Sequence, residues 1–297
     1  MKALLQKLRQ KILIARYQWS NLNNKSQQEA LSVISILTDE ETVRRIVEER
    51  LSVSRFGDGE FDVMAGGSNG FQIQDERLGK RLREVIMTPL SNLLVCIPYS
   101  FKSQRKLTSD SKLFALGFLN ENFERAIKPF LKEGKVYGDS LFTRFYMGRN
   151  DKRRTADYVK LLQKLWEGED LLIVEGCQSR LGVGNDLFSN VRSIKRILCP
   201  ACNAFDKYDE ILATTQSHSA GRLVVLALGM TATVLAYDLA KQGIRALDLG
   251  HIDVEYEWYR MGATHKVPLV GKKVNEARGE VEGVLNFNES EVVACIK

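Results

Sequence analysis

The feature that most constrains the fold is an alternation of short apolar runs with longer helical patterns. Continuous apolar runs are typical of strands buried on both faces, and the segments between most of them repeat apolar residues at helical spacing. The expected strands are 51–56, 92–97, 135–137, 170–174, 193–198, 222–228 and 244–247. The expected helices are 27–37, 40–50, 76–87, 112–130, 155–166, 205–216 and 230–241. This order predicts an α/β fold with a Rossmann-like, mainly parallel sheet and helices on both faces.

A basic amphipathic helix is expected before this pattern, within residues 1–25. Its apolar residues recur three and four positions apart: Leu5, Leu8, Ile12, Ala15, Trp19 and Leu22. We consider three interpretations: docking on its own domain or on a second subunit (a homodimer), contact with a membrane surface, and a targeting peptide. The expected domain organisation is therefore this helix at 1–25, a helical lead-in at 26–50 and one catalytic domain at 51–297.

The positive charge of the chain is concentrated in that first helix. Six of the 43 Lys and Arg residues lie within positions 1–25, where there is no acidic residue, so the rest of the chain carries 37 bases against 37 acids. A duplex-binding protein needs a clustered basic face for its phosphate contacts. A neutral body of this kind argues against nucleic acid as a partner.

Cysteine usage and hydropathy indicate the cellular compartment. The five cysteines are odd in number and scattered, which is typical of a reducing environment. The N-terminal segment lacks the apolar core of a signal peptide, and the longest uncharged apolar stretch, 223–237, is shorter than the ~20 residues that span a bilayer. We expect a cytoplasmic protein. Peripheral contact with the inner face of the membrane is the alternative that the first helix leaves open.

The first polar residues after an expected strand form the turn Gly57-Asp58-Gly59-Glu60. In parallel sheets the ligand lies beyond the carboxyl ends of the strands. Asp58 and Glu60 can face one site, and carboxylates combined with substrate phosphates are ligands that Mn²⁺ and Mg²⁺ favour. Gly57 permits a close backbone approach, and Arg55 adds a cation suited to phosphate. The alternative is an ordinary acidic turn.

A second polar segment, 174–186, follows the most apolar of the expected strands. Its glycines, serine, arginine and Asn-Asp pair have no evident packing role, which favours a loop that wraps a polar ligand with backbone N–H groups. The candidate donor-binding residues here are Glu175, Gly176, Ser179, Arg180, Gly182, Gly184 and Asn185. The segment lacks the Gly-Lys-Ser/Thr ending of a Walker A loop, and the alternative is a long surface loop.

Two shorter segments also follow expected strands. Gly229 and Thr231 lie at a helix start, where small residues expose N–H groups and the positive end of the helix dipole to an anion. A plain connection capped by Thr231 is the alternative. Asp139, Ser140 and Arg144 add further polar groups after the strand 135–137.

The last candidate segment contains His251, one of three histidines in the chain and the one at a strand end beside acids. This histidine could bind phosphate, ligate a metal or transfer a proton. The acids Asp253, Glu255 and Glu257 alternate after it and suggest a polar edge that is partly solvated. Taken together, these polar strand ends describe a metal–diphosphate site, with acids for the cation and donors for the phosphates.

The order of these motifs resembles the GT-D-type glycosyltransferases, a family long catalogued as a domain of unknown function. The matching segments are 55–60, 138–140, 175–176 with 179–186, and 249–258, within about residues 40–280. The resemblance implies a Rossmann-like domain that takes a sugar, typically glucose, from a UDP-sugar, with Mn²⁺ (Mg²⁺ as the alternative) held through Asp58 and Glu60. It places His251 near the diphosphate or the acceptor. The best-known members extend glycans on bacterial surface glycoproteins, and others belong to cell-surface polysaccharide synthesis.

We therefore expect a metal-dependent hexosyltransferase whose acceptor is a glycan on a glycoprotein or a lipid carrier. A carboxylate such as Asp253 or Glu175, or His251, would deprotonate the acceptor hydroxyl. Two alternatives use the same residues: a metal-dependent phosphohydrolase acting on nucleotide-type diphosphates, and a non-catalytic nucleotide-sugar-binding protein.

Overall fold

The computed structural model describes residues 2–67, 75–274, 277 and 285–297, with side chains from Leu4 onward. Its described residues form one nine-stranded sheet in which every pair of neighbours is parallel, in the order β1-β4-β3-β2-β8-β7-β5-β6-β9. The strands are β1 (Ser35–Ile36), β2 (Ser52–Arg55), β3 (Leu93–Ile97), β4 (Val136–Asp139), β5 (Asp170–Gly176), β6 (Ser193–Cys199), β7 (Leu223–Ala227), β8 (Ala246–Asp248) and β9 (Val292–Cys295). The predicted α/β parallel sheet is confirmed.

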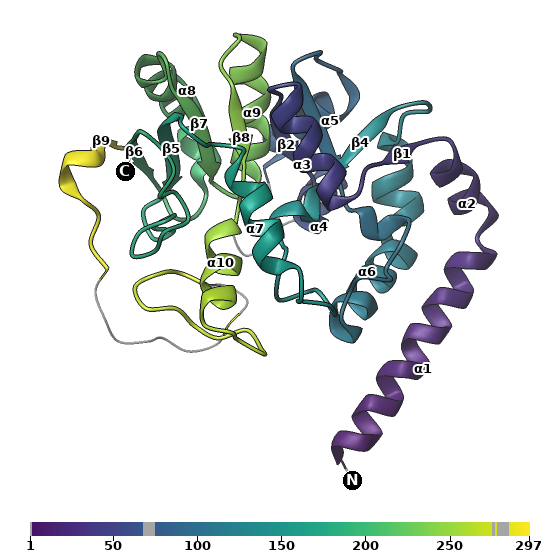
Figure 1. Ribbon diagram of the computed structural model, residues 1–297. Coiled ribbons are helices and arrows are strands. Elements are labelled where there is room, and N and C mark those ends of the chain that lie inside the picture. The colour runs from purple at the N-terminus through teal and green to yellow at the C-terminus, as the bar shows by residue number, and fades with distance from the viewer. Residues whose placement is uncertain (1, 68–74, 275–276, 278–284) are drawn as a thin grey trace.

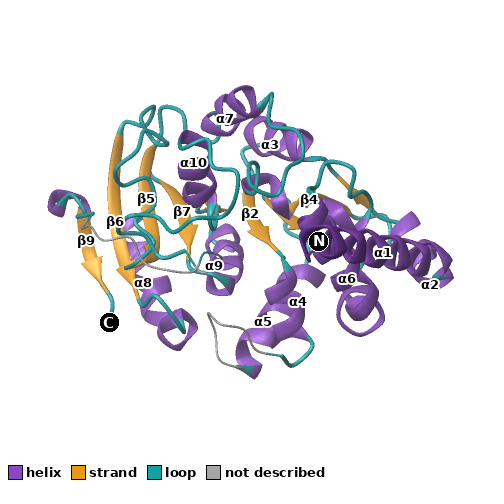
Figure 2. Ribbon diagram, turned by 90° about the horizontal axis from the view of Figure 1, so that it is seen from below, coloured by secondary structure: helices purple, strands orange, loops and turns teal. Residues whose placement is uncertain are grey.

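Helices cover both faces of this sheet, as Figure 2 shows edge-on. They are α1 (Lys2–Asn23), α2 (Lys25–Ser32), α3 (Asp39–Glu48), α4 (Asp58–Met64), α5 (Glu76–Met87), α6 (Ser109–Asn122), α7 (Thr155–Gln163), α8 (Tyr208–His218), α9 (Met230–Lys241) and α10 (Ile252–Arg260). Because successive strand residues point to opposite faces, Leu93, Val95 and Ile97 join one buried cluster and Leu94 and Cys96 the other. The first cluster includes α4, α5, α8 and α9, and the second includes α3, α7 and α10.

Some element boundaries differ from the expectation. The expected helix 27–37 ends at Ser32, because Ser35 and Ile36 leave it to pair with β4 as the short edge strand β1. The opposite edge strand β9, which was not expected, pairs with β6. The α-helix expected to reach residue 130 ends at Asn122 and continues as a π-helical segment (Phe123–Ile127) and a 3₁₀ turn (Lys128–Phe130). Pro129 lies in that last turn, and a proline ring is not accommodated inside an α-helix. Two helices, α4 and α10, were missed altogether.

Residues 26–50 form part of the sheet assembly, since they supply β1 and the covering helix α3. Helix α3 begins with a capping box: Thr38 accepts from the Glu41 N–H, and the Glu41 carboxylate accepts from the Thr38 N–H at 2.8 Å. The division of the chain at residues 25 and 50 stays a prediction.

The first helix, α1, lies along α6 and extends past the rest of the domain (Figure 1). It docks through polar side chains: the Tyr17 hydroxyl donates to Glu121 at 2.9 Å, and the Asn21 amide donates to the Leu116 carbonyl at 3.3 Å. The apolar residues of the predicted stripe point elsewhere and stay exposed. Among the described residues, no helix has the length and hydropathy needed to cross a membrane.

The sheet order identifies where a ligand fits. The chain runs outward from β2 through β3 to β4, and later elements return on the other side to place β8 next to β2. In open α/β sheets the crevice beyond the carboxyl ends at such a switch point is where ligands bind.

Candidate active site

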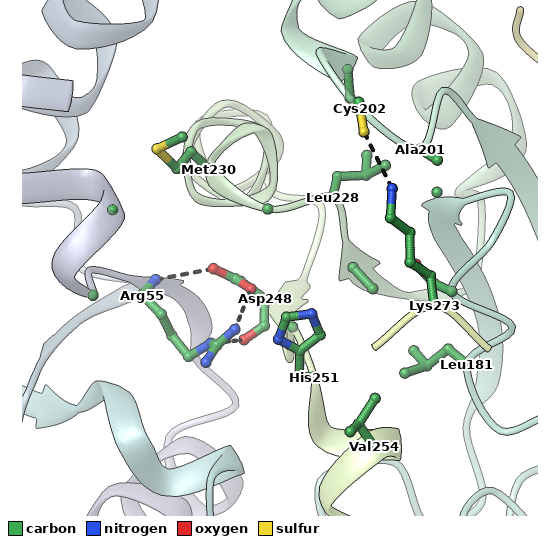
Figure 3. Close-up of a pocket in the computed structure, with 18 of the residues that line it drawn as sticks. Arg55, Leu181, Ala201, Cys202, Leu228, Met230, Asp248, His251, Val254 and Lys273 are labelled. Carbon is green, nitrogen blue, oxygen red and sulfur yellow. Dashed lines mark hydrogen bonds and ion pairs between the residues drawn. The ribbon is translucent and has the colours of Figure 1, made fainter. Parts of the chain in front are cut away.

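A pocket of about 410 Å³ lies at the carboxyl edge of the sheet, around the β2–β8 switch point. Segments that follow β2, β4, β5, β6, β7 and β8 line it, so six loops distant in sequence meet there (Figure 3). Of the residues predicted from sequence, the lining includes Arg55, Gly57, Asp58, Glu60, Ser140, Gly176, Ser179, Gly229, His251 and Asp253. Its size falls within the range of small-molecule sites, roughly 300–1,000 Å³.

The Asp58-Gly59-Glu60 turn is the first turn of α4. Glu60 accepts from the Gly57 N–H at 2.7 Å and so satisfies one of the open donors at the helix start. Desolvation by burial, with added repulsion from Asp248 and Asp58, raises the pKa of Glu60 to about 7. Asp58 is exposed at the pocket wall. Both carboxyls gain from the positive end of the helix dipole, and a bound cation would relieve the repulsion at Glu60.

Arg55 lines the pocket and connects the elements around it through hydrogen bonds and an ion pair. Its Nε donates to the Asp248 carbonyl at 2.8 Å, its Nη2 pairs with the Asp248 carboxylate at 3.0 Å, and its Nη1 donates to Thr143 at 2.9 Å and the Ser140 carbonyl at 3.2 Å. A side chain at Gly250, where φ is +51°, would collide with this guanidinium. Arg55 was predicted as a phosphate-binding cation; the structure uses its donors to join β2, β8 and the loop after β4.

His251 precedes α10 and lies against Arg144 from the loop after β4. Arg144 Nη2 is 2.8 Å from His251 Nδ1. Because a guanidinium only donates, Nδ1 is the acceptor and the proton of the neutral ring is on Nε2. Arg144 also lies 3.9 Å from Glu255, which accepts from the N–H groups of Tyr146 and Met147. Both residues line the pocket, so the pair brings a guanidinium and an imidazole to a pocket that already contains carboxylates.

Asp253 contributes to a buried ionic cluster that closes one side of the pocket. Lys272 donates to Asp253 at 2.6 Å and to Glu257 at 3.2 Å, and both the Lys272 and the Asp253 side chains are 2% exposed. The Gly182 N–H and the Asn185 amide also donate to Asp253, at 2.9 and 2.7 Å. With both oxygens engaged, Asp253 fastens the 176–186 loop and the segment around Lys272 together, so this geometry does not present it as a proton acceptor. The polar edge that we expected to be partly solvated is instead one side of a helix in which Asp253 and Glu255 are buried, while Glu257 is partly exposed.

Several predicted donor-binding residues lie behind the pocket wall. Glu175 is buried in an ion pair with Arg196 at 2.6 Å, and Asp139 caps its own turn by accepting from the Leu141 N–H at 2.9 Å. Arg180 turns to the Gly271 carbonyl. The predicted residues that are not part of the lining are Asp139, Glu175, Arg180, Gly182, Gly184, Asn185 and Thr231. Gly229, rather than Thr231, is the N-cap of α9.

Other lining residues were missed as site residues. Asp248 is buried beside Glu60, and burial raises its pKa. Lys273 lies across the pocket with its Nζ 3.5 Å from Cys202 Sγ, and both residues line it (Figure 3). The polar position of Asp248 at a strand end could have identified it, whereas Lys273 follows no expected strand and gave no signal.

The fit of a divalent cation depends on the acidic turn. No group of three or more His, Cys, Asp or Glu side chains within the described part of the chain is arranged to hold a metal. Asp58 and Glu60 fit the other common arrangement, in which one or two carboxylates hold Mg²⁺ or Mn²⁺ and substrate phosphates and water complete the shell.

Comparison with known proteins agrees with this geometry. The GT-D glycosyltransferase fold pattern matches residues 53–277. The chain belongs to the GT-D glycosyltransferase family. It is 41% identical to a probable glycosyl transferase, Gly, of Streptococcus gordonii over 82% of this chain, and 39% identical to glycosyltransferase GlyD of Streptococcus pneumoniae over 83%. The chain spans only about a third of the length of these curated relatives, 36% and 30% respectively.

Solved structures of GT-D relatives superpose closely. A domain described as a distinct glycosyltransferase fold matches with a TM-score of 0.85 and 41% identity, over 92% of this chain and 99% of that one. A glycosyltransferase from Streptococcus sanguinis matches with a TM-score of 0.82 and 39% identity, over 89% of this chain and all of that one. The predicted resemblance to GT-D is confirmed.

Proposed function

We propose that this GT-D protein is a metal-dependent glycosyltransferase that moves a sugar from a nucleotide-sugar donor, UDP-glucose, to a glycan acceptor. One observation carries the proposal: an acidic helix start at Asp58 and Glu60 faces the same pocket as the Arg144–His251 donor pair. A carboxylate pair suits a cation, and a guanidinium with an imidazole N–H suits a diphosphate. The glycosyltransferase names of the relatives support the reaction class.

Asp58 and Glu60 would hold Mn²⁺, or Mg²⁺ in its place, and the ion would supply positive charge to the leaving diphosphate. His251 would donate its Nε2 proton as a hydrogen bond to a diphosphate oxygen. Arg144 would fix the ring by donating to Nδ1 and would add positive charge where negative charge develops. The Nδ1 atom of His251 accepts a hydrogen bond from Arg144, and its Nε2 atom carries the proton. We therefore assign His251 to binding of the sugar nucleotide and not to deprotonation of the glycan hydroxyl.

The proposed acceptor is a glycan on a surface glycoprotein or on a lipid carrier, within glycoprotein or cell-surface polysaccharide synthesis. Nucleotide sugars are anionic, and the neutral charge of residues 26–297 leaves recognition to local groups such as Arg144 and His251 rather than to an overall field. The cytoplasmic location stays a prediction.

Calorimetric titration of UDP and UDP-glucose, with and without Mn²⁺, tests the donor site. We expect metal-dependent binding by the wild type and its loss in Asp58→Ala. Asp62→Ala is the matched control, because Asp62 lies one turn further along α4 and is not part of the pocket lining. Metal-dependent binding that survives in Asp58→Ala would show that the metal does not bind at this turn. Absence of binding of any UDP-sugar would rule out a UDP-sugar as the donor.

Product analysis separates the reaction classes. With a glycan acceptor present, we expect sugar incorporation in step with UDP release. Release of phosphate without sugar transfer would favour the phosphohydrolase, and donor binding without turnover on any acceptor would favour a non-catalytic binding protein.

A further inference from the structure

We propose that α1 is a membrane-surface helix that binds an anionic lipid bilayer through its exposed apolar stripe. The stripe consists of Leu5, Leu8, Ile12, Ala15, Trp19 and Leu22. This interaction is independent of the sugar donor and of the chemistry in the pocket.

The first argument is that the domain contacts the opposite side of the helix. Gln10, Tyr17 and Asn21 form hydrogen bonds with α6, and Gly117 of α6 leaves room for the Tyr17 ring. These positions are about half a turn away from the stripe on a helix of 3.6 residues per turn. The helix is thus held on the protein by a polar face, which leaves its apolar face outward.

The second argument is the extent of exposure. Leu8 is 54% exposed, Ile12 58%, Trp19 70% and Leu22 73%, all along one line of the helix. A continuous exposed apolar surface of this kind marks an interaction site. Figure 1 shows α1 extending away from the domain, with the N-terminus on the same lower side as α10, whose first turn lines the pocket.

The third argument, charge, selects the partner. Arg9, Lys11 and Arg16 are exposed and flank the stripe on its two sides, and residues 1–25 contain no acid. In a two-helix coiled coil built on this stripe, these flanking positions would face the same positions of a second copy in either orientation. A second copy would therefore bring like charges together, whereas an anionic lipid surface complements them.

The experiment uses the full chain and vesicles of phosphatidylcholine, with or without about 30% phosphatidylglycerol. We expect cosedimentation with the anionic vesicles that weakens as salt is raised, and little with phosphatidylcholine alone. Leu8→Ser combined with Ile12→Ser should lower the partition coefficient by ~10-fold or more. Met87→Ser combined with Met261→Ser is the matched control, since both methionines are exposed elsewhere.

Charge is tested in the same assay. Replacing Arg9, Lys11 and Arg16 by Gln should weaken binding by about 100-fold, since each basic residue near the surface contributes about fivefold. The control removes three exposed charges elsewhere, with Lys80→Gln, Lys160→Gln and Lys164→Gln. Equal losses in the two variants would overturn the assignment to α1.

Tryptophan emission gives a direct reading, because Trp166 and Trp258 are fully buried and Trp19 is exposed. We expect a blue shift on anionic vesicles that is absent in Trp19→Phe. Light scattering after size exclusion measures the oligomeric state. If the chain is a dimer that Leu8→Ser combined with Ile12→Ser dissociates, and its tryptophan emission does not shift on vesicles, the stripe binds a second copy and the proposal is overturned. Far-UV circular dichroism of each variant verifies that the fold is kept.

Discussion

Two helix-start turns share the pattern Asp-x-Glu but lie in different environments. Asp58-Gly59-Glu60 lies in the first turn of α4 after β2, and Asp253-Val254-Glu255 lies in the first turn of α10 after β8. The two strands are neighbours in the sheet. Each turn is thus a D-x-E at a helix start at the carboxyl edge, where the helix dipole stabilises carboxylates.

The partners differ. Asp253 is neutralised by Lys272 and hydrogen-bonded to two groups of the 176–186 loop, while Glu255 accepts two backbone N–H groups. Asp58 has no Lys or Arg partner within the part of the chain that the structure describes, and Glu60 is bound to its own helix start. The comparison teaches that the carboxylates of a D-x-E pattern stay open to a cation only where the protein has not already supplied one, and the metal at Asp58 and Glu60 remains our proposal.

The largest expected effect is on the second turn. Lys272→Met leaves Asp253 buried without its cation, and we expect the free energy of unfolding to fall by about 3–5 kcal/mol. Combining it with Asp253→Asn should recover part of that loss, because no unpaired charge remains. Urea denaturation of both single variants and the double variant measures the interaction free energy between Lys272 and Asp253. If the losses of stability are additive, the ion pair does not hold the 176–186 loop and the segment around Lys272 together.

Asp58→Asn should give the reverse pattern. We expect turnover to fall by about 10²- to 10³-fold because charge stabilisation at the diphosphate is lost. The free energy of unfolding should change by no more than about 0.5 kcal/mol, since the side chain is exposed. Steady-state kinetics and urea denaturation are compared with Asp62→Asn, which should retain activity. A large loss of stability in Asp58→Asn would remove the contrast between the two turns.

His251→Ala tests the pocket side of the second turn, because His251 is the N-cap of α10 and lines the pocket. Loss of a hydrogen bond to a charged diphosphate should weaken UDP binding by about 10- to 100-fold. His251→Asn keeps an N–H donor and should lose less. Calorimetry gives the affinity and kinetics the turnover; unchanged UDP affinity with a strongly reduced kcat would instead assign His251 to proton transfer.

The smallest expected effect concerns Glu60. In Glu60→Gln the amide oxygen can still accept from the Gly57 N–H, so we expect the free energy of unfolding to change by less than about 1 kcal/mol. Glu60→Ala removes this capping hydrogen bond, and we expect it to lower the free energy of unfolding by about 1 kcal/mol. Mn²⁺ affinity in the presence of UDP should nevertheless fall in both. Denaturation midpoints and calorimetry separate the two roles, and full metal affinity in Glu60→Gln would confine Glu60 to capping.

Sequence reasoning found the seven central strands. The clearest of them, β3 and β7, are continuously apolar because both of their faces are buried. Sequence reasoning missed β1 and β9, which are short edge strands of two and four residues. It also missed α4 and α10, because each begins directly after a strand with acids that read as a turn. For α1 it found the amphipathic pattern, but the apolar face is exposed and the polar face docks.

The sequence by itself determined the parallel α/β architecture, the GT-D resemblance and the set of polar strand ends, since all of these depend on local periodicity and on motif order. Only the tertiary structure decided which of those polar residues line the pocket. Lys272 reaches Asp253 across 19 positions and Arg196 reaches Glu175 across 21, whereas no such cation reaches Asp58 within the described residues. Pairing of charges distant in sequence depends on how the strands are ordered and how loops fold over their ends, and local pattern does not encode that order.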